Sequence, residues 1–412
     1  MISLDKEIEK VILVGVALYN EESTLLSLKE LSELAKTAGA EVVGQVIQNR
    51  DTIHPVTYVG KGKIDEIKDL AWEMEATGII CDDELSPVQM RNLQDALDLK
   101  VMDRTLVILD IFAGRASTKE GKIQVELAQL KYSQTRLTGK GIEMSRLGGG
   151  IGTRGPGEKK LEQDRRLIKT RIGQLQRELK EVKRHRETMR EGRNRNNLPV
   201  VAIVGYTNAG KSTLLNELTG ADILAEDQLF ATLDPTTRSL VMHNSAEVLL
   251  TDTVGFINKL PHHLIEAFKS TLEEAKYADI ILHVVDASNQ EAELQMHTVY
   301  TTLTDLGVTN KPIITAFNKQ DRLVEPVIIK DFKADYCVNI SAKTRVGFDK
   351  LLETLEKVLR EQKVYIERVY DYNEASKIAL IRKQGELISE NYTDKGIEVK
   401  AYVPPQILDQ VR

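Results

Sequence analysis

Gly205-Tyr-Thr-Asn-Ala-Gly210-Lys211-Ser212 decides the fold in the middle of this 412-residue chain. The stretch matches G-x-x-x-x-G-K-[ST] and lies between an apolar run, Val200–Val204, that predicts a strand and a run, Lys211–Thr219, that predicts a helix. Backbone N–H groups of such a loop surround phosphates at the helix N-terminus, where the dipole favours anions. We expect Lys211 to reach the β- and γ-phosphates of a nucleotide and Ser212 to ligate Mg²⁺. The pattern predicts a P-loop on an α/β sheet, and the alternative is a chance glycine turn.

A second motif, Asn318-Lys-Gln-Asp321, follows a predicted strand and indicates which base is bound. A carboxylate at 321 can accept hydrogen bonds from both N1–H and the 2-amino group of guanine, and adenine offers neither donor in that arrangement. Asn318 is expected to brace the loop, and the stem of Lys319 to lie against the base. Ser341-Ala342-Lys343 is expected to close the pocket, with the Ala342 N–H near guanine O6. These residues favour GTP over ATP.

Two further stretches are expected to sense the γ-phosphate. Asp252-Thr-Val-Gly255 ends a predicted strand, so that Asp252 can hold the Mg²⁺ shell and the Gly255 N–H can contact the phosphate. In Phe230-Ala-Thr-Leu-Asp-Pro-Thr-Thr237, Thr232 is our choice for the switch I threonine that caps Mg²⁺. Thr236 and Thr237 are its competitors, unless they only form a turn after Pro235.

The candidate nucleotide-binding residues are Gly205, Tyr206, Thr207, Asn208, Ala209, Gly210, Lys211, Ser212, Thr213, Phe230, Ala231, Thr232, Leu233, Asp234, Asp252, Thr253, Val254, Gly255, Asn318, Lys319, Asp321, Ser341, Ala342 and Lys343. The candidate catalytic residues among them are Lys211, Thr232 and Gly255. The candidate metal ligands are Ser212, Thr232 and Asp252.

Phe256 stands where GTPases of the Ras type carry a glutamine that orients the attacking water. Phenylalanine neither donates nor accepts a hydrogen bond, so we expect intrinsic hydrolysis to be slow unless something else completes the site. One completion is a monovalent cation such as K⁺, held against the phosphates with help from Asn208. The other is a partner that orders the switches. Asn208 is equally well explained by an ordinary loop hydrogen bond.

Composition narrows the class of protein. Two cysteines exclude a disulfide framework. No apolar run approaches the ~20 residues that span a bilayer, and the acidic N-terminus lacks a secretion signal, so a cytoplasmic location is expected. The net charge of −6 hides an asymmetry, because residues 114–197 hold 22 Lys and Arg against 10 Asp and Glu. Such a block indicates a polyanionic partner, often nucleic acid, or simply a solvated helical surface.

The chain divides into four predicted regions. Residues 1–113 alternate strands and helices, which predicts a small α/β domain with a largely parallel sheet. Residues 114–197 predict a basic antiparallel helical hairpin, 198–363 a Ras-like G domain, and 364–412 a small α+β appendage. In the region 1–113 we expect strands at 11–17, 41–48 and 78–81 and helices at 21–37 and 63–76. Asp82 and Asp83, after the third strand, are interpreted as loop carboxylates.

The predicted hairpin has helices at 121–137 and 158–190 and a glycine-rich tip at 138–157. An apolar stripe along the second helix is expected to face the first: Leu161, Ile168, Ile172, Leu175, Leu179, Val182 and Met189. The tip contains G-x-G-x-x-G at 150–155. We reject a dinucleotide site there, because the motif follows a helix rather than a strand. A flexible linker and a loop that approaches RNA closely remain open.

Four stretches together resemble the HflX family of ribosome-associated GTPases: Leu147–Glu158 (LGGGIGTRGPGE), Gly205–Thr213 (GYTNAGKST), Phe230–Arg238 (FATLDPTTR) and Asp252–Glu274 (DTVGFINKLPHHLIEAFKSTLEE). The resemblance covers nearly the whole chain. It implies binding to the large ribosomal subunit near the peptidyl transferase centre, a role in splitting or rescuing stalled ribosomes, and hydrolysis that ribosomal particles stimulate. It also implies Mg²⁺ on Ser212 and Thr232, and guanine on Asn318, Asp321 and Ser341–Lys343.

With this resemblance, ribosomal RNA becomes the expected partner of residues 114–197. We expect a monomer that binds GTP and GDP and does not bind membranes. Two alternatives are kept. One is an ATP-dependent RNA remodeller, which Asp321 disfavours. The other is a nucleotide-gated ribosome-binding protein with negligible hydrolysis, which Phe256 favours.

Overall fold

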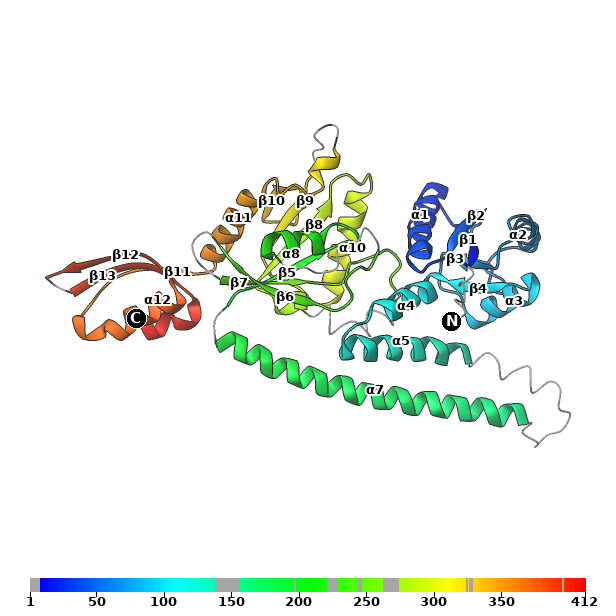
Figure 1. Cartoon of the computed structure of the whole chain (residues 1–412), viewed down its shortest axis with the longest axis horizontal. Coiled ribbons are helices and arrows are strands. Elements are labelled where there is room, and N and C mark those ends of the chain that lie inside the picture. Colours follow the sequence, from blue (N-terminus) through cyan, green and yellow to red (C-terminus); the bar gives the residue numbers. More distant parts are fainter. Residues whose placement is uncertain are drawn as a thin grey trace, which may run out of the picture.

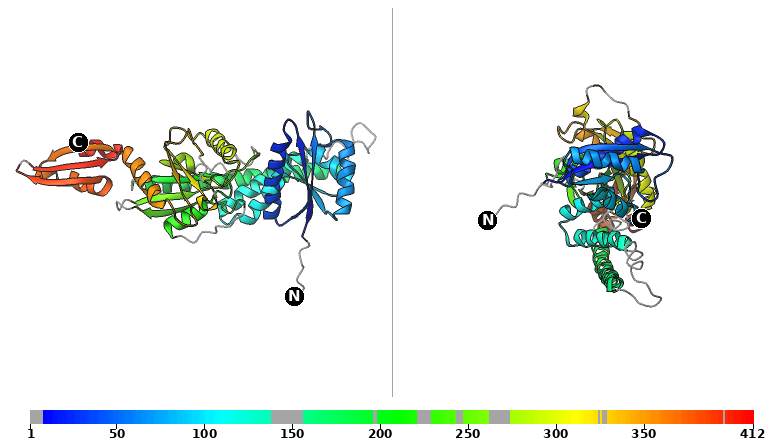
Figure 2. Two further views of the ribbon diagram at one scale, coloured as in Figure 1. Left: turned by 90° about the horizontal axis from the view of Figure 1, so that it is seen from above. Right: turned by 90° about the vertical axis from the view of Figure 1, so that its right-hand side faces the viewer.

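The structure is a computed structural model that describes residues 8–137, 156–195, 198–220, 229–242, 247–261, 274–323, 325, 329–394 and 396–412. Three sheets follow one another along an elongated molecule, with the N-terminal sheet and the C-terminal appendage at opposite ends and the central sheet between them (Figures 1 and 2). A long helix, α7 (Pro156–Arg195), runs beneath the central sheet in Figure 1. The predicted glycine-rich tip lies outside the described residues, except for its last two positions.

The N-terminal sheet has the order β2-β1-β3-β4, and all its strand pairs are parallel, which confirms the predicted architecture. Its strands are β1 (Lys10–Ala17), β2 (Glu41–Asn49), β3 (Gly78–Cys81) and β4 (Lys100–Asp103), and its helices are α1 (Glu21–Thr37), α2 (Lys61–Glu73) and α3 (Pro87–Leu97). Local sequence fixes the helix starts. Asn20 accepts a hydrogen bond from the Glu22 N–H before α1, and Ser86 forms a capping box with Gln89 before α3.

Helix α4 (Arg104–Arg115) leads from this sheet to the hairpin, which consists of α5 (Lys119–Leu137) and α7. The predicted apolar stripe is confirmed at four of its positions: Ile168, Ile172, Leu175 and Leu179 pack against Ile123, Leu127 and Leu130. The helices are antiparallel, because Arg165 near the start of α7 donates to the Leu137 carbonyl at the end of α5. Helix α7 begins and ends outside the predicted bounds, and it is 40 residues long.

The central sheet has the order β10-β9-β8-β5-β7-β6 and confirms the predicted α/β class. Its elements are β5 (Val200–Gly205), α8 (Lys211–Thr219), β6 (Thr236–Val241), β7 (Glu247–Asp252), β8 (Ile280–Asp286), α10 (Ala292–Asp305), β9 (Ile313–Asn318), η1 (Gln320–Arg322), β10 (Tyr336–Asn339) and α11 (Phe348–Glu361). All pairs are parallel except β6 with β7. Thr236 and Thr237, for which a turn was the alternative to a switch I role, instead begin β6 and pair with Asp252 and Thr251.

The C-terminal appendage is a three-stranded antiparallel sheet of order β11-β13-β12. It comprises β11 (Val364–Tyr370), η2 (Tyr372–Glu374), α12 (Ala375–Gln384), β12 (Glu386–Thr393), β13 (Gly396–Val403), η3 (Pro405–Ile407) and α13 (Leu408–Val411). Ile378 and Ile381 of α12 belong to the same buried cluster as Val399 and Ala401 of β13, so the helix and the sheet form a core of their own. The predicted α+β character is confirmed.

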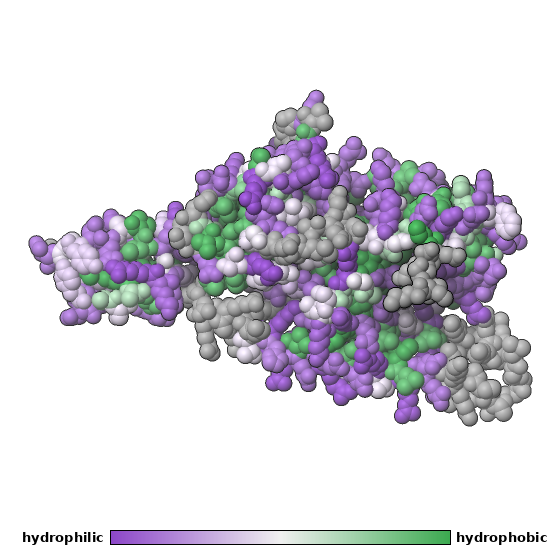
Figure 3. Space-filling model, viewed as in Figure 1, coloured by the Kyte–Doolittle hydropathy of each residue, from purple (hydrophilic) through white to green (hydrophobic). Residues whose placement is uncertain are grey.

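The surface in Figure 3 is largely polar, as the high content of charged residues predicts. Figure 3 shows hydrophilic residues over most of one face, including the stretch over α7. No described helix combines the length and the apolar character that a bilayer crossing requires.

Candidate functional site

The loop between β5 and α8 needs glycine at both ends. Gly205 and Gly210 have φ angles of 156° and 95°, in the left-handed region that favours glycine. A Cβ at Gly205 would lie 2.3 Å from the Val284 carbonyl oxygen, and one at Gly210 would lie 2.3 Å from Asn318 Nδ2. The loop therefore sits tightly between the sheet and the base-recognition motif. Its curvature leaves backbone N–H groups at the N-terminus of α8.

A cavity opens above this loop, and it brings the predicted P-loop and switch residues together. Its lining is Thr207, Asn208, Gly210, Lys211, Ser212, Thr213, Phe230, Ala231, Thr232, Thr253 and Gly255. Lys211 is buried beside it, and its Nζ donates to the Tyr206 carbonyl at 2.7 Å. Burial lowers the pKa of Lys211 to about 8, although nearby Asp252 opposes the shift. The Lys211 ammonium is thus placed at the cavity, where phosphate oxygens could replace the Tyr206 carbonyl as its hydrogen-bond partner.

Oxygen atoms of Ser212, Thr232 and Asp252 converge at one side of the cavity. Ser212 Oγ lies 2.7 Å from Thr232 Oγ1 and donates to Asp252 Oδ2 at 2.7 Å. The second oxygen, Asp252 Oδ1, is buried and has no hydrogen-bond partner among the described residues. Burial raises the pKa of Asp252. Two hydroxyls and a carboxylate whose second oxygen has no hydrogen-bond partner are oxygen ligands of the kind that Mg²⁺ prefers, so the residues fit this ion.

Of the three candidate threonines, the structure brings Thr232 to this set. Thr237 lies in β6, and its hydroxyl bonds the Thr251 hydroxyl at 2.9 Å. Thr236 belongs to the same strand. Among the described residues, no group of three or more His, Cys, Asp or Glu side chains is placed to hold a metal ion elsewhere.

The predicted base pocket is built by the central domain from its own residues. The Asn318 side chain donates to the Ala209 carbonyl at 2.9 Å and accepts from the Ala342 N–H at 2.8 Å, so it ties the P-loop to the Ser341–Lys343 loop. Asp321 is exposed and accepts from Ser341 Oγ at 2.6 Å, and this hydrogen bond lowers its pKa. A free carboxylate edge therefore faces solvent where a base would lie. Lys319 pairs with Asp286 at 2.8 Å.

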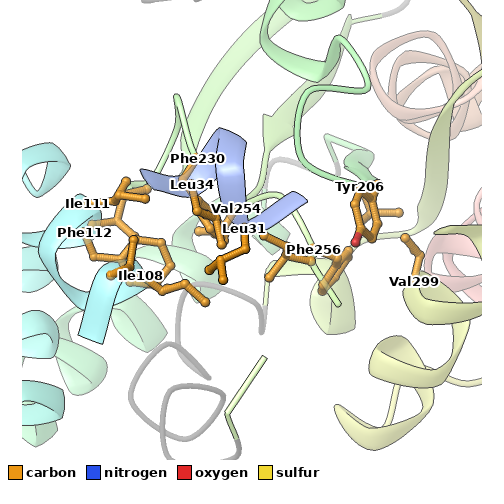
Figure 4. Close-up of a cluster of buried hydrophobic side chains, with 14 of the residues drawn as sticks. Leu31, Leu34, Ile108, Ile111, Phe112, Tyr206, Phe230, Val254, Phe256 and Val299 are labelled. Atoms are coloured by element: carbon orange, nitrogen blue, oxygen red, sulfur yellow. The ribbon is translucent and has the colours of Figure 1, made fainter. Parts of the chain in front are cut away.

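We call the switch side the part of the site formed by switch I, around Thr232, and by switch II, the stretch that begins at Asp252. It makes contacts with residues 8–137 that sequence patterns did not indicate. Phe256 is 2% exposed, in a core that also holds Leu31 and Leu34 of α1 and Phe230 of switch I. Figure 4 shows Phe256 beside Tyr206, near Leu31 and Val254. Phe256 therefore does more than replace a glutamine, because it is one of the apolar contacts between two regions of the chain.

A buried polar network accompanies that core. Arg104 is 1% exposed and pairs with Asp82 and Glu30, each at 2.8 Å. Lys259, three residues after Phe256, pairs with both Asp82 and Asp83. Burial alone would raise the pKa of Asp82, but Arg104 and Lys259 together lower it. Asp82 does lie in the loop after β3, as interpreted, but it is buried there and binds switch II to the N-terminal sheet.

Comparison with known proteins places this geometry in a family. Models described as "GTP-binding GTPase N-terminal", "GTP-binding GTPase Middle Region" and "50S ribosome-binding GTPase" match residues 26–113, 115–193 and 200–319. The chain is 64% identical over 407 residues to the GTPase HflX of Lacrimispora saccharolytica, covering 99% of this chain and 96% of that protein. The chain belongs to the HflX family. The GTPase HflX of Escherichia coli is 43% identical over 350 residues, covering 84% of this chain and 82% of that one.

HflX-family membership makes this chain a GTP-binding protein and a GTPase, as its motifs predicted. Among solved structures, a GTP-binding protein from the archaeon Sulfolobus solfataricus in complex with GDP is 25% identical. That likeness has a TM-score of 0.46 and covers 85% of this chain and 98% of the other.

Proposed function

We propose that this chain is a GTP-driven switch that acts on the large ribosomal subunit and splits or rescues stalled ribosomes. The observation that carries the proposal is the cluster of the Ser212 and Thr232 hydroxyls with Asp252 beside the P-loop, in which Asp252 Oδ2 accepts from Ser212 and Asp252 Oδ1 has no partner among the described residues. Such a set can bind switch I in the triphosphate state and release it after hydrolysis. The ribosomal partner is supported by the family description "50S ribosome-binding GTPase".

The candidate residues would divide the work as follows. Lys211 would bind the β- and γ-phosphates, and Gly255 would place its N–H near the γ-phosphate. Ser212, Thr232 and Asp252 would hold Mg²⁺, which supplies charge neutralisation on the phosphate oxygens when bound. Asp321 would accept the two guanine donors. Competition of GTP and ATP for a fluorescent guanine nucleotide tests this selectivity, and comparable affinities would favour the ATP-dependent remodeller instead.

Hydrolysis by the isolated chain is expected to be slow, because Phe256 is buried in the core and leaves no side chain at that position to orient water. Asn208 is exposed and lines the cavity, which supports the alternative that K⁺ completes the site. Turnover in K⁺ and Na⁺ at equal ionic strength tests this, and equal rates would exclude it. Single-turnover hydrolysis without acceleration by ribosomes would favour a nucleotide-gated binder with negligible hydrolysis.

The proposed ribosomal contact is residues 114–197 on ribosomal RNA. Helix α7 exposes a series of basic side chains: Arg166, Lys169, Arg177, Lys180 and Arg184. At about 1.5 Å per residue, its 40 residues extend over roughly 60 Å. If these cations displace phosphate counterions, binding weakens steeply with salt. A flat salt response would contradict this interface.

The deciding experiment is co-sedimentation of the chain with separated ribosomal subunits, in a non-hydrolysable GTP analogue and in GDP. We expect the chain to sediment with the large subunit in the presence of the analogue. In GDP, much less of the chain should sediment with it. Sedimentation with neither subunit in either nucleotide would overturn the proposal. In this proposal the chain is a monomer and is located with ribosomes in the cytoplasm. Its domains are residues 1–113, 114–197, 198–363 and 364–412.

A further inference from the structure

The switch I segment is fastened on both sides of Thr232, and both anchors lie on the N-terminal half of the chain. Before Thr232, Phe230 is 2% exposed and has a left-handed backbone, with φ of 56°. Its ring meets that of Phe112 of α4 edge to face, with centroids 4.7 Å apart. After Thr232, Asp234 reaches the junction between α4 and α5. Thr232 is therefore held between two contacts that the central sheet does not provide.

The second anchor is a carboxylate that accepts four hydrogen bonds. Asp234 Oδ2 accepts from the Ser117 N–H at 3.0 Å, the Ser117 hydroxyl at 2.8 Å and the Thr118 N–H at 2.9 Å. Asp234 Oδ1 accepts from the Thr118 hydroxyl. Partial burial would raise the pKa of Asp234, but the hydrogen bonds from Thr118 and Ser117 lower it. The carboxylate therefore stays ionised at the positive end of α5.

The first turn of α5 is shaped to receive this carboxylate. The Thr118 hydroxyl accepts from the Gly121 N–H at 2.9 Å while it donates to Asp234, so one side chain caps the helix and binds switch I. A Cβ on Gly121 would lie 2.4 Å from Asp234 Oδ1. Glycine costs stability inside a helix, and here it leaves the space that the carboxylate fills.

We propose that Asp234 is a positioning residue, which fastens switch I to the α4–α5 junction and thereby holds Thr232 at the metal-binding oxygens. The inference rests on the proposed role of Thr232 and extends it to Ser117, Thr118 and Gly121. Thr232 contributes to binding when a triphosphate and Mg²⁺ are present. A segment that is ordered in advance spares triphosphate binding the entropy of ordering it. Asp234 therefore raises the preference for GTP over GDP.

The test measures, on the full chain with Mg²⁺, the affinities for a non-hydrolysable GTP analogue and for GDP. Asp234→Ala and Gly121→Ala are expected to lower the ratio of the two affinities about tenfold, that is, by about 1.4 kcal/mol. The affinity ratio of Asp234→Asn is expected to lie between those of these variants and that of the unsubstituted chain. Its amide oxygen can still accept hydrogen bonds, but its NH₂ group would face the donors of Ser117 or Thr118. Gly121→Ala leaves the amino-acid sequence of switch I unchanged and favours the helix, so its effect would come from displacing the Asp234 carboxylate.

Gly173→Ala is the matched control. It also puts a methyl group into a hairpin helix, but a Cβ there meets nothing within 4 Å. We expect no change in the affinity ratio. The double variant Gly121→Ala/Asp234→Ala is expected to be no worse than the worse single one, because both remove the same contact.

Thr232→Ala separates this inference from the proposed function. If Thr232→Ala leaves the affinity ratio unchanged, the role of Thr232 itself fails. If Thr232→Ala lowers the ratio but Gly121→Ala and Asp234→Asn do not, the positioning role of Asp234 is overturned. An equal loss of affinity for both nucleotides would also overturn it, since that is what general destabilisation produces. The conservative Asp234→Asn and the helix-favouring Gly121→Ala keep the test valid should Asp234→Ala fail to fold.

Discussion

The two sides of the nucleotide site are supported in different ways. On the base side, Asn318 connects the P-loop to the Ser341–Lys343 loop, and its hydrogen bonds, like that of Asp321, are made within the central sheet and its loops. On the switch side, Phe256 and Lys259 rest on the N-terminal sheet and its helices. The proposed base recognition would therefore depend on one domain. The arrangement of the switches is a property of two.

This difference teaches where regulation can enter. A change in how residues 8–137 pack on the central sheet leaves the base side unchanged and alters the switch side directly. By reciprocity, a ligand that shifts the switches alters the packing of the N-terminal region by the same free energy. The hairpin begins in that region, at the Thr118 cap of α5.

The largest expected effect comes from removing an apolar contact on the switch side. Phe256→Ala should lower the free energy of unfolding by about 3–5 kcal/mol, because it removes a buried aromatic ring from a close-packed core. Phe332→Ala is the matched control, since Phe332 is 91% exposed, and it should change stability by less than about 0.5 kcal/mol. Urea unfolding of both variants measures the difference. Equal, small effects would show that the two regions do not depend on this ring.

The second prediction concerns the phosphates, which both sides share. Lys211→Ala should weaken binding of GTP and GDP at least about 100-fold, because charge-assisted hydrogen bonds contribute roughly 1.5–3 kcal/mol each. Lys350→Ala, on the exposed face of α11, is the control and should bind normally. Fluorescent nucleotide titration measures both. Unchanged affinity in Lys211→Ala would mean that phosphates are held elsewhere.

The third prediction tests the independence of the base side. Asp321→Asn should weaken guanine nucleotides about 10- to 100-fold and improve binding of a purine with a carbonyl at position 2, because an amide donates where a carboxylate accepts. Its thermal stability should stay near that of the unsubstituted chain, since Asp321 is exposed. Asp349→Asn, also exposed, serves as the control. A large loss of stability in Asp321→Asn would contradict the independence of this side.

Sequence could place Asn318 and Asp321 at the end of a strand for a physical reason. Asn318 ends the buried strand β9 and Asp321 lies in the short η1 that follows, so an apolar run followed by this motif is enough to locate both. Strand β6 was missed because TTRSLV follows a proline and is mostly solvent-exposed, and its strand character comes from pairing with β7. The contacts of Asp82 and Lys259 were also missed. Both are ordinary polar residues in sequence, and their pairing depends on how two distant regions meet.

The smallest expected effect sharpens the polar half of the switch side. Lys259→Met keeps the aliphatic stem and removes the charge that pairs with Asp82 and Asp83. We expect a loss of about 1 kcal/mol in the free energy of unfolding at neutral pH, because Lys259 is partly exposed and Arg104 still pairs with Asp82. Lys10→Met, which breaks the more exposed pair with Glu75, is the control and should cost less.

The pH dependence of Lys259→Met gives this last prediction its direction. The pKa of Asp82 is lowered in the folded chain, so the stabilisation is present above the pKa of an unfolded aspartate, about 3.9, and is lost as pH falls below it. The difference between Lys259→Met and the unsubstituted chain should therefore be constant from pH 7 to about 5 and shrink in stronger acid. A difference no larger than that of Lys10→Met at every pH would mean that the ion pairs of Lys259 add nothing to the contact between switch II and the N-terminal sheet.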